Sequence, residues 1–96
     1  MERPLALLFV DIADSTQLYE RVGNVQAAAL AQKVLAHLRL IIGTNEGTVI
    51  KSLGDGLLGA FPTADGAAHS ALTMMEQQPS YGLRLRVGIH FGPVIQ

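Results

Sequence analysis

The stretch VIKSLGDGLLGAF (residues 49–61) places the tripeptide GDG between two apolar runs. Asp-Gly between such runs is a strong signal for a β-hairpin, because both residue types tolerate a positive φ angle. The stretch therefore predicts two antiparallel strands, at 48–53 and 57–61, joined by a tight turn. Most turns of this composition serve only as turns, so at this point it stays open whether Asp55 also holds a ligand.

The composition bounds the class of protein. Ninety-six residues suffice for one small domain. Hydrophobic residues make up 49% of the chain and charged residues 16%, which excludes a disordered segment. Seven basic and eight acidic residues nearly cancel, so no electrostatic footprint for nucleic acid or an anionic membrane is expected. The absence of cysteine excludes disulfides, zinc–thiolate sites and cysteine nucleophiles.

The apolar run at 5–10 is too short for a signal peptide. No window reaches the roughly 20 apolar residues of a membrane span. The sequence therefore predicts a cytoplasmic segment without membrane contact, although the parent protein could be anchored outside it.

The hairpin lies within an ordered series of strand and helix signals. The run at 5–10 is typical of a strand buried on both faces, and Asp14 with Gln17 has the spacing of a capping box. The predicted elements are a strand at 5–10, a helix from Asp14 to about Val22, a helix from Val25 that ends at Gly43, the hairpin, a helix from Ala64 to about Gln77 capped by Thr63, a turn at Pro79-Ser80, and a strand at 83–91. The order β-α-α-β-β-α-β predicts an α+β, ferredoxin-like fold with helices on one face of a four-stranded antiparallel sheet.

This topology brings two aspartates to one edge of the sheet. Asp11 ends the first strand, and Asp55 lies in the hairpin turn. A right-handed crossover makes the first two strands parallel, and the split layout places the third strand between them, about 4.8 Å from each. Two carboxylates so close together repel each other unless a cation lies between them. Magnesium prefers a few carboxylates together with phosphate oxygens, so the sequence predicts a metal–phosphate site formed by Asp11 and Asp55.

The segment that follows the first strand favours a polyphosphate beside the metal. IADST at 12–16 opens a helix whose first N–H groups have no helical partners. Gly54 and Gly56 let the backbone approach a ligand closely. Without such a ligand, the polar residues have ordinary roles as a helix cap (Asp14), a solvated edge-strand lysine (Lys51) and a solvent-facing strip of the last strand (Arg86 and His90).

Three stretches resemble, in order and spacing, the catalytic domain of class III nucleotidyl cyclases. They are LLFVDIADST at 7–16, VIKSLGDGLLGAF at 49–61 and LRVGIHFGPV at 85–94. The resemblance covers nearly all of residues 1–96 and implies the cyclase core fold. It also implies an adenylate cyclase, in which the ribose 3′-hydroxyl of ATP attacks the α-phosphorus to form 3′,5′-cyclic AMP and pyrophosphate.

The resemblance implies a role for each matched position. Asp11 and Asp55 match the catalytic, metal-binding aspartates, and the carbonyl of Ile12 matches the backbone ligand of a site for two Mg²⁺ or Mn²⁺ ions. The residues that match the nucleotide-binding positions are Asp14, Ser15 and Thr16, whose amides cradle the triphosphate, together with Gly54 and Lys51. A lysine at position 51 donates to N1 of adenine and favours ATP, whereas enzymes that use GTP typically have glutamate there. Because this lysine serves the partner's aspartates, the implied unit is a head-to-tail homodimer.

The resemblance also implies functional residues that would follow Gln96, namely a second purine reader, an asparagine that orients the ribose and an arginine that stabilises the transition state. We therefore expect residues 1–96 to be the N-terminal part of a cyclase domain, with little or no turnover alone. The main alternative is a non-catalytic cyclase-homology module that binds nucleotide or dimerises. A guanylate cyclase is less favoured because of Lys51. A diguanylate cyclase is less favoured because LGDGLL replaces the GG[DE]EF turn, and a DxDxT phosphatase because DIADST has its second aspartate one residue late.

Overall fold

The predicted hairpin forms the outer half of a four-stranded sheet in the computed structural model, which describes residues 2–81 and 83–95. The elements are β1 (Glu2–Ile12), α1 (Ser15–Val22), α2 (Asn24–Thr44), β2 (Thr48–Leu53), β3 (Gly56–Phe61), α3 (Ala64–Tyr81) and β4 (Leu85–Ile95). The strand order is β2-β3-β1-β4, and each neighbouring pair is antiparallel. Both the predicted element order and the position of β3 between β1 and β2 are confirmed.

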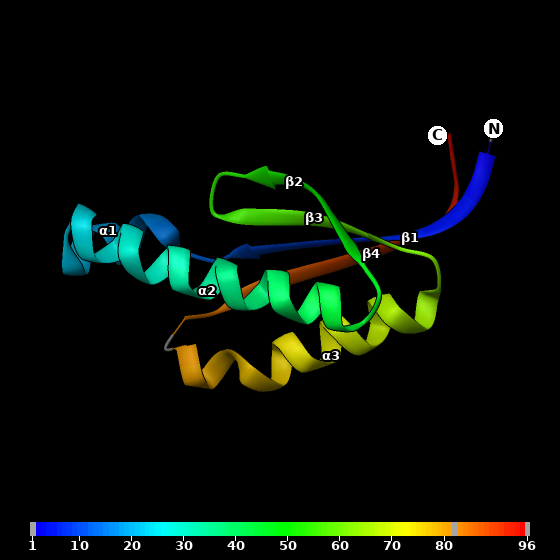
Figure 1. The fold of residues 1–96 in the computed structure, drawn as a ribbon. Helices are drawn as coiled ribbons and strands as arrows, with labels where there is room; N and C mark the ends of the chain where they lie inside the picture. The colour runs from blue at the N-terminus through cyan, green and yellow to red at the C-terminus, as the bar shows by residue number, and fades with distance from the viewer. Residues whose placement is uncertain (1, 82, 96) are drawn as a thin grey trace.

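The helices α2 and α3 cover one face of the sheet, and α1 lies beyond the end of β1 (Figure 1). Alternate residues of β1 point into the core between sheet and helices, where Leu8 is fully buried and Val10 is 2% exposed. The expectation that β1 is buried on both faces is wrong, because Phe9 between them is 46% exposed. No described helix covers the second face of the sheet, which leaves that face open for the site described below.

Helix α2 ends differently from the prediction. Gly43 lies inside the helix, and Asn45 caps it by donating from Nδ2 to the carbonyl of Ile41 at 3.0 Å. The residue with a left-handed backbone is Glu46, with φ of 67°, rather than a glycine. An asparagine amide can satisfy a terminal helix carbonyl as well as a glycine motif does. The observed C-cap therefore lies two residues after the predicted one.

Helix α3 continues through residues 79–80, where a turn was predicted. Thr63 caps its start as predicted, since its Oγ1 accepts the N–H of Gly66 at 3.1 Å. Near the other end, Oε1 of Gln78 accepts the N–H of Leu85 at 2.9 Å and ties α3 to β4. The turn was inferred from local propensity alone, and tertiary contacts of this kind override propensity.

Helix α2 is long and apolar enough, by length and composition, to cross a membrane, although no such window was expected. Seven of its side chains are buried in the fold, including Val34, Leu38 and Ile42. Its outer face is mixed: Val25 and Leu40 are exposed there, and Arg39 donates to Oγ of Ser52 at 2.6 Å. A long helix whose apolar stripe is buried against a sheet is the core helix of a packed domain.

Candidate functional site

The open face of the sheet carries two neighbouring rows of residues. Residues directly opposite each other on adjacent strands point to the same face. In one row, Asp11 of β1 lies between Gly56 of β3 and Arg86 of β4. In the next row, Phe9 lies between Leu58 and Gly88. The register therefore places a carboxylate, a guanidinium and an aromatic ring together on the open face.

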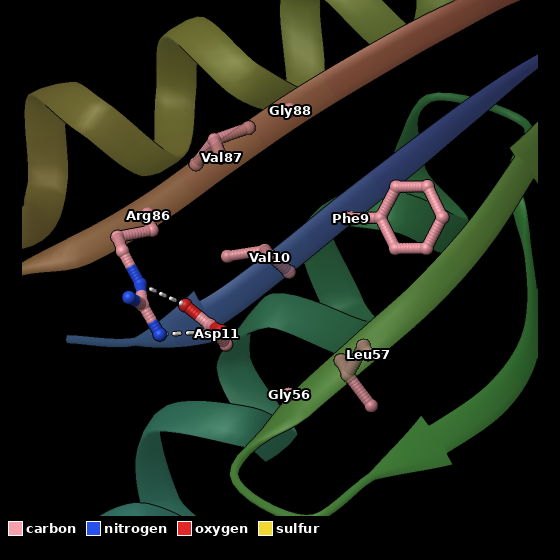
Figure 2. A pocket seen from close by; sticks show the side chains of 8 residues that line it. All are labelled: Phe9, Val10, Asp11, Gly56, Leu57, Arg86, Val87 and Gly88. Carbon is pink, nitrogen blue, oxygen red and sulfur yellow. Dashed lines mark hydrogen bonds and ion pairs between the residues drawn. The ribbon is translucent and has the colours of Figure 1, made fainter.

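Asp11 and Arg86 form a bidentate ion pair (Figure 2). Nε of Arg86 donates to Oδ1 at 2.9 Å, and Nη2 donates to Oδ2 at 3.0 Å. These hydrogen bonds, and then the charge of the carboxylate, raise the pKa of Arg86 above its ordinary value. From the sequence, Arg86 was expected only as part of a solvent-facing strip of the last strand. Its partner follows from the β1–β4 register, which no local pattern specifies.

The hairpin turn places Asp55 beside Asp11. Leu53 pairs with Gly56, so the two central turn residues are Gly54 and Asp55. Only Gly54 has a positive φ, of 60°, which corrects the predicted Asp-Gly turn to a Gly-Asp turn with its glycine first, as type II′ requires. The backbone carbonyl of Asp55 accepts the N–H of Ile12 at 3.1 Å.

Gly56 makes the close approach of the two strand ends possible. A Cβ atom there would lie 2.7 Å from the carbonyl oxygen of Val10 and 2.8 Å from Cβ of Asp11. Both distances are shorter than real contacts allow. The glycine after Asp55 is thus required by the neighbouring strand, whereas the glycine before it is required by the turn.

Asp14 does not cap α1 with its side chain, which makes the predicted capping box wrong. Its backbone is left-handed, with φ of 60° and ψ of 34°. Its carboxylate instead accepts Nη2 of Arg84 at 2.8 Å, because a charged partner binds a carboxylate more strongly than a neutral amide does. Helix α1 begins directly after it, at Ser15, so the unpaired N–H groups of the first turn still follow Asp11 closely.

Lys51 lies on the same open face but on the outer strand. It pairs with Leu58, which pairs with Phe9, so two strand spacings separate it from β1. At about 4.8 Å for each spacing, Lys51 is well outside contact distance of Asp11. The structure therefore places Asp11, Asp55 and the first turn of α1 together, and it places Lys51 apart from them.

The oxygen atoms at this edge suit a hard cation. No group of three or more His, Cys, Asp or Glu residues that could hold a metal occurs within residues 2–81 and 83–95. Magnesium does not need such a group, because one or two carboxylates suffice when phosphate and water complete its shell. The guanidinium of Arg86 on both oxygens of Asp11 shows that this carboxylate is placed to accept a positive charge. The residues present fit a divalent cation.

A pocket of about 280 Å³ opens beside the ion pair. Asp11 and Arg86 line one end of it, and Phe9 and Gly88 line the other (Figure 2). The volume is close to the lower limit for small-molecule sites. A charged end and an apolar end suit a ligand that has an anionic part and a flat apolar part.

Comparison with known proteins identifies relatives across nearly the whole chain. The family model described as "Adenylate and Guanylate cyclase catalytic domain" matches residues 2–96. A protein of Streptomyces coelicolor named "Adenylate cyclase" is 31% identical over an alignment of 96 residues, which covers 98% of this chain and 25% of that protein. The chain thus spans about a quarter of the length of that relative.

Solved structures share the fold. A bacterial light-regulated adenylyl cyclase superposes with a TM-score of 0.87 at 21% identity, covering 99% of this chain and 56% of the other. The guanylate cyclase domain of RhGC from Catenaria anguillulae, solved in complex with GTP, superposes with a TM-score of 0.86 at 21% identity, covering 99% of this chain and 60% of the other. The chain spans just over half the length of these two structures.

Proposed function

This chain belongs to the adenylate and guanylate cyclase catalytic domain family, and we propose that it serves an adenylate cyclase that converts ATP to 3′,5′-cyclic AMP and pyrophosphate. The observation that carries the proposal is the juxtaposition of Asp11 with the turn residue Asp55, through the Asp11–Gly56 pair and the hydrogen bond from Ile12 to Asp55. The two carboxylate-bearing segments that a metal-dependent cyclase needs thus meet at one edge of the sheet.

Asp11, Asp55 and the carbonyl of Ile12 would hold two Mg²⁺ or Mn²⁺ ions. When bound, such ions lower the pKa of the attacking 3′-hydroxyl and stabilise the charge on the leaving pyrophosphate. The chain's own contribution is to fix the carboxylates by the strand register and the tight turn. Most of the catalysis of phosphoryl transfer is positioning and charge stabilisation of this kind.

The triphosphate would bind at the start of α1. The amides of Asp14, Ser15 and Thr16 belong to the first turn after β1, whose N–H groups suit phosphate oxygens. Gly54, which has no Cβ, leaves the turn beside them open, since nothing lies within 4 Å of the position that its Cβ would take. Both features are adjacent to the carboxylates, so the phosphates and the metal ions would share one site.

The choice of ATP over GTP rests on Lys51, because a lysine donates to the N1 acceptor of adenine and cannot accept from guanine. The similarity to the Streptomyces coelicolor protein named "Adenylate cyclase" also supports ATP as the substrate. Because Lys51 lies two strands from Asp11, we place it at the site of a partner subunit in a head-to-tail homodimer. A guanylate cyclase is the second candidate, since one of the similar structures holds GTP.

Calorimetric titration tests the metal and nucleotide site. A non-cyclisable ATP analogue with Mn²⁺ should bind the wild-type chain and should bind the Asp55→Ala variant at least about tenfold more weakly, because the bound metal would lose a carboxylate. Asp65→Ala removes an equally charged, exposed residue from α3 and should leave the affinity unchanged. Equal binding by wild type and Asp55→Ala would overturn the metal site, and tighter binding of the GTP analogue would favour the second candidate.

Turnover distinguishes a cyclase from a non-catalytic homology module. The full-length gene product, incubated with ATP and Mg²⁺, should release cyclic AMP and pyrophosphate in equal amounts. Binding of the analogue without any cyclic nucleotide product would support the module instead.

A further inference from the structure

The ion pair between Asp11 and Arg86 uses the carboxylate oxygens that a metal would need. Nε and Nη2 of Arg86 engage Oδ1 and Oδ2 at 2.9 and 3.0 Å, one hydrogen bond to each oxygen. A magnesium ion binds carboxylate oxygen at about 2.0–2.1 Å in a strict octahedral shell. A guanidinium that grips both oxygens leaves no room for such a shell, and its positive charge repels the ion.

We propose that Arg86 is the resident counter-ion of Asp11 and has to leave that carboxylate before a divalent cation binds, so that it sets the metal affinity of the site. The inference rests on the proposed function, since it takes Asp11 as a metal ligand. Arg86 acts through Asp11 and is therefore a positioning residue: it neutralises the carboxylate when no metal is bound, and it opposes weak or incidental metal binding.

The exchange is feasible because the pair is exposed and has space beside it. The side chain of Arg86 is 70% exposed and that of Asp11 is 44% exposed, so solvent already screens their attraction. Two residues along β4, Gly88 has nothing within 4 Å of its missing Cβ. The pocket between Asp11 and Gly88 offers the released guanidinium a place on the same face of the sheet.

A second ion pair provides a matched control. Nη2 of Arg84, two residues before Arg86, donates to Oδ2 of Asp14 at 2.8 Å, and its side chain is also 70% exposed. Removing either arginine removes one positive charge from the same part of the chain. Only the removal of Arg86 frees the oxygens of Asp11, so the difference between the two variants isolates the competition from the change in net charge.

Titration of the chain with Mn²⁺ alone, without nucleotide, gives the first test. The Arg86→Gln variant should bind Mn²⁺ about three- to fivefold more tightly than Arg84→Gln, as expected for the loss of an exposed, bidentate competitor. An equal gain in Mn²⁺ affinity in both variants would show that only the change in net charge matters. Weaker Mn²⁺ binding by Arg86→Gln would show that Arg86 prepares Asp11 for the metal. Either result would overturn the inference.

The Asp55→Ala variant separates this inference from the proposed function. Loss of Mn²⁺ binding in Asp55→Ala, together with equal affinities of the two arginine variants, would overturn the inference alone. Mn²⁺ binding that does not depend on Asp55 would overturn the proposed two-carboxylate site, and Mn²⁺ binding that is also unchanged in an Asp11→Asn variant would overturn the inference.

Nuclear magnetic resonance of the wild-type chain gives a test that needs no arginine variant. Saturating Mg²⁺ should shift the Nε–H signal of Arg86 from its hydrogen-bonded position to the position found in an Asp11→Asn variant. The Nε–H signal of Arg84 should move little. An Arg86 signal that stays in place while Mg²⁺ binds would contradict the exchange.

Discussion

At the scale of single residues, two glycines of the open face have opposite requirements. Gly56 lies against the backbone of Val10 and the side chain of Asp11, so the tight spacing of the strand ends depends on its missing Cβ. Gly88, in the neighbouring row and on the other side of β1, has open space where its Cβ would be. One glycine is therefore a packing requirement of the site, and the other is a place where the site stays open.

We expect Gly56→Ala to destabilise the chain by about 1–3 kcal/mol, because the new methyl group overpacks against backbone that cannot move freely. The variant should also weaken Mn²⁺ binding, since Asp11 is displaced. Gly88→Ala should stay within about 1 kcal/mol of the wild type. Urea unfolding and Mn²⁺ titration measure both effects, and equal stabilities of the two variants would contradict the packing argument.

At the scale of elements, the hairpin β2–β3 does more than connect two strands. Its two-residue turn sets the register of β2 against β3 and places Asp55 directly before Gly56, which the β1–β3 register sets opposite Asp11. A longer or differently bent turn would shift β3, and a slip of one residue would move every side chain to the opposite face. The turn is thus a structural element whose geometry determines the site.

Alanine substitution of two glycines tests that geometry. Gly54→Ala should cost about 1–2 kcal/mol in the free energy of unfolding, because alanine is strained at a φ of 60°. Gly43→Ala, inside α2 and without steric neighbours, should instead stabilise the chain by about 0.5–1 kcal/mol. Thermal or urea unfolding gives both values. A Gly54→Ala chain as stable as the wild type would show that the turn tolerates another geometry.

At the scale of the whole molecule, the two faces of the sheet have different roles: the covered face forms the hydrophobic core, and the open face carries the candidate site. Helices α2 and α3 bury one face (Figure 1). The register places Asp11, Arg86, Lys51 and the half-exposed ring of Phe9 on the other face. This second face is available to nucleotide and to another subunit. The separation of Lys51 from Asp11 is consistent with a site that two subunits complete.

Mixing two defective chains tests the shared site. Neither Asp55→Ala nor Lys51→Ala should bind the Mn²⁺–ATP analogue well alone. In an equal mixture that pairs at random, half of the dimers contain one of each chain and carry one intact site, which restores about a quarter of the wild-type sites. Calorimetric stoichiometry measures this fraction. A mixture that binds no better than the separate variants would argue against a shared site.

Much of the fold could be predicted from local patterns. The apolar stripe of α2, the cap at Thr63 and the strand alternation around Arg86 all appear where the sequence places them. The errors concern features that depend on packing. The end of α2 depends on the side chain of Asn45, and the length of α3 depends on the tie between Gln78 and Leu85.

In the candidate site, too, some features follow from the sequence and others depend on tertiary packing. From chain order, the right-handed crossover and the split ferredoxin-like layout, the sequence alone placed β3 beside β1 and therefore Asp55 near Asp11. Only the tertiary structure decided that Arg86 holds Asp11 and that Arg84 draws Asp14 away from capping α1. The physical reason is that both ion pairs join residues at least 70 positions apart. Their partners are set by the register of two strands and not by any neighbour in the chain.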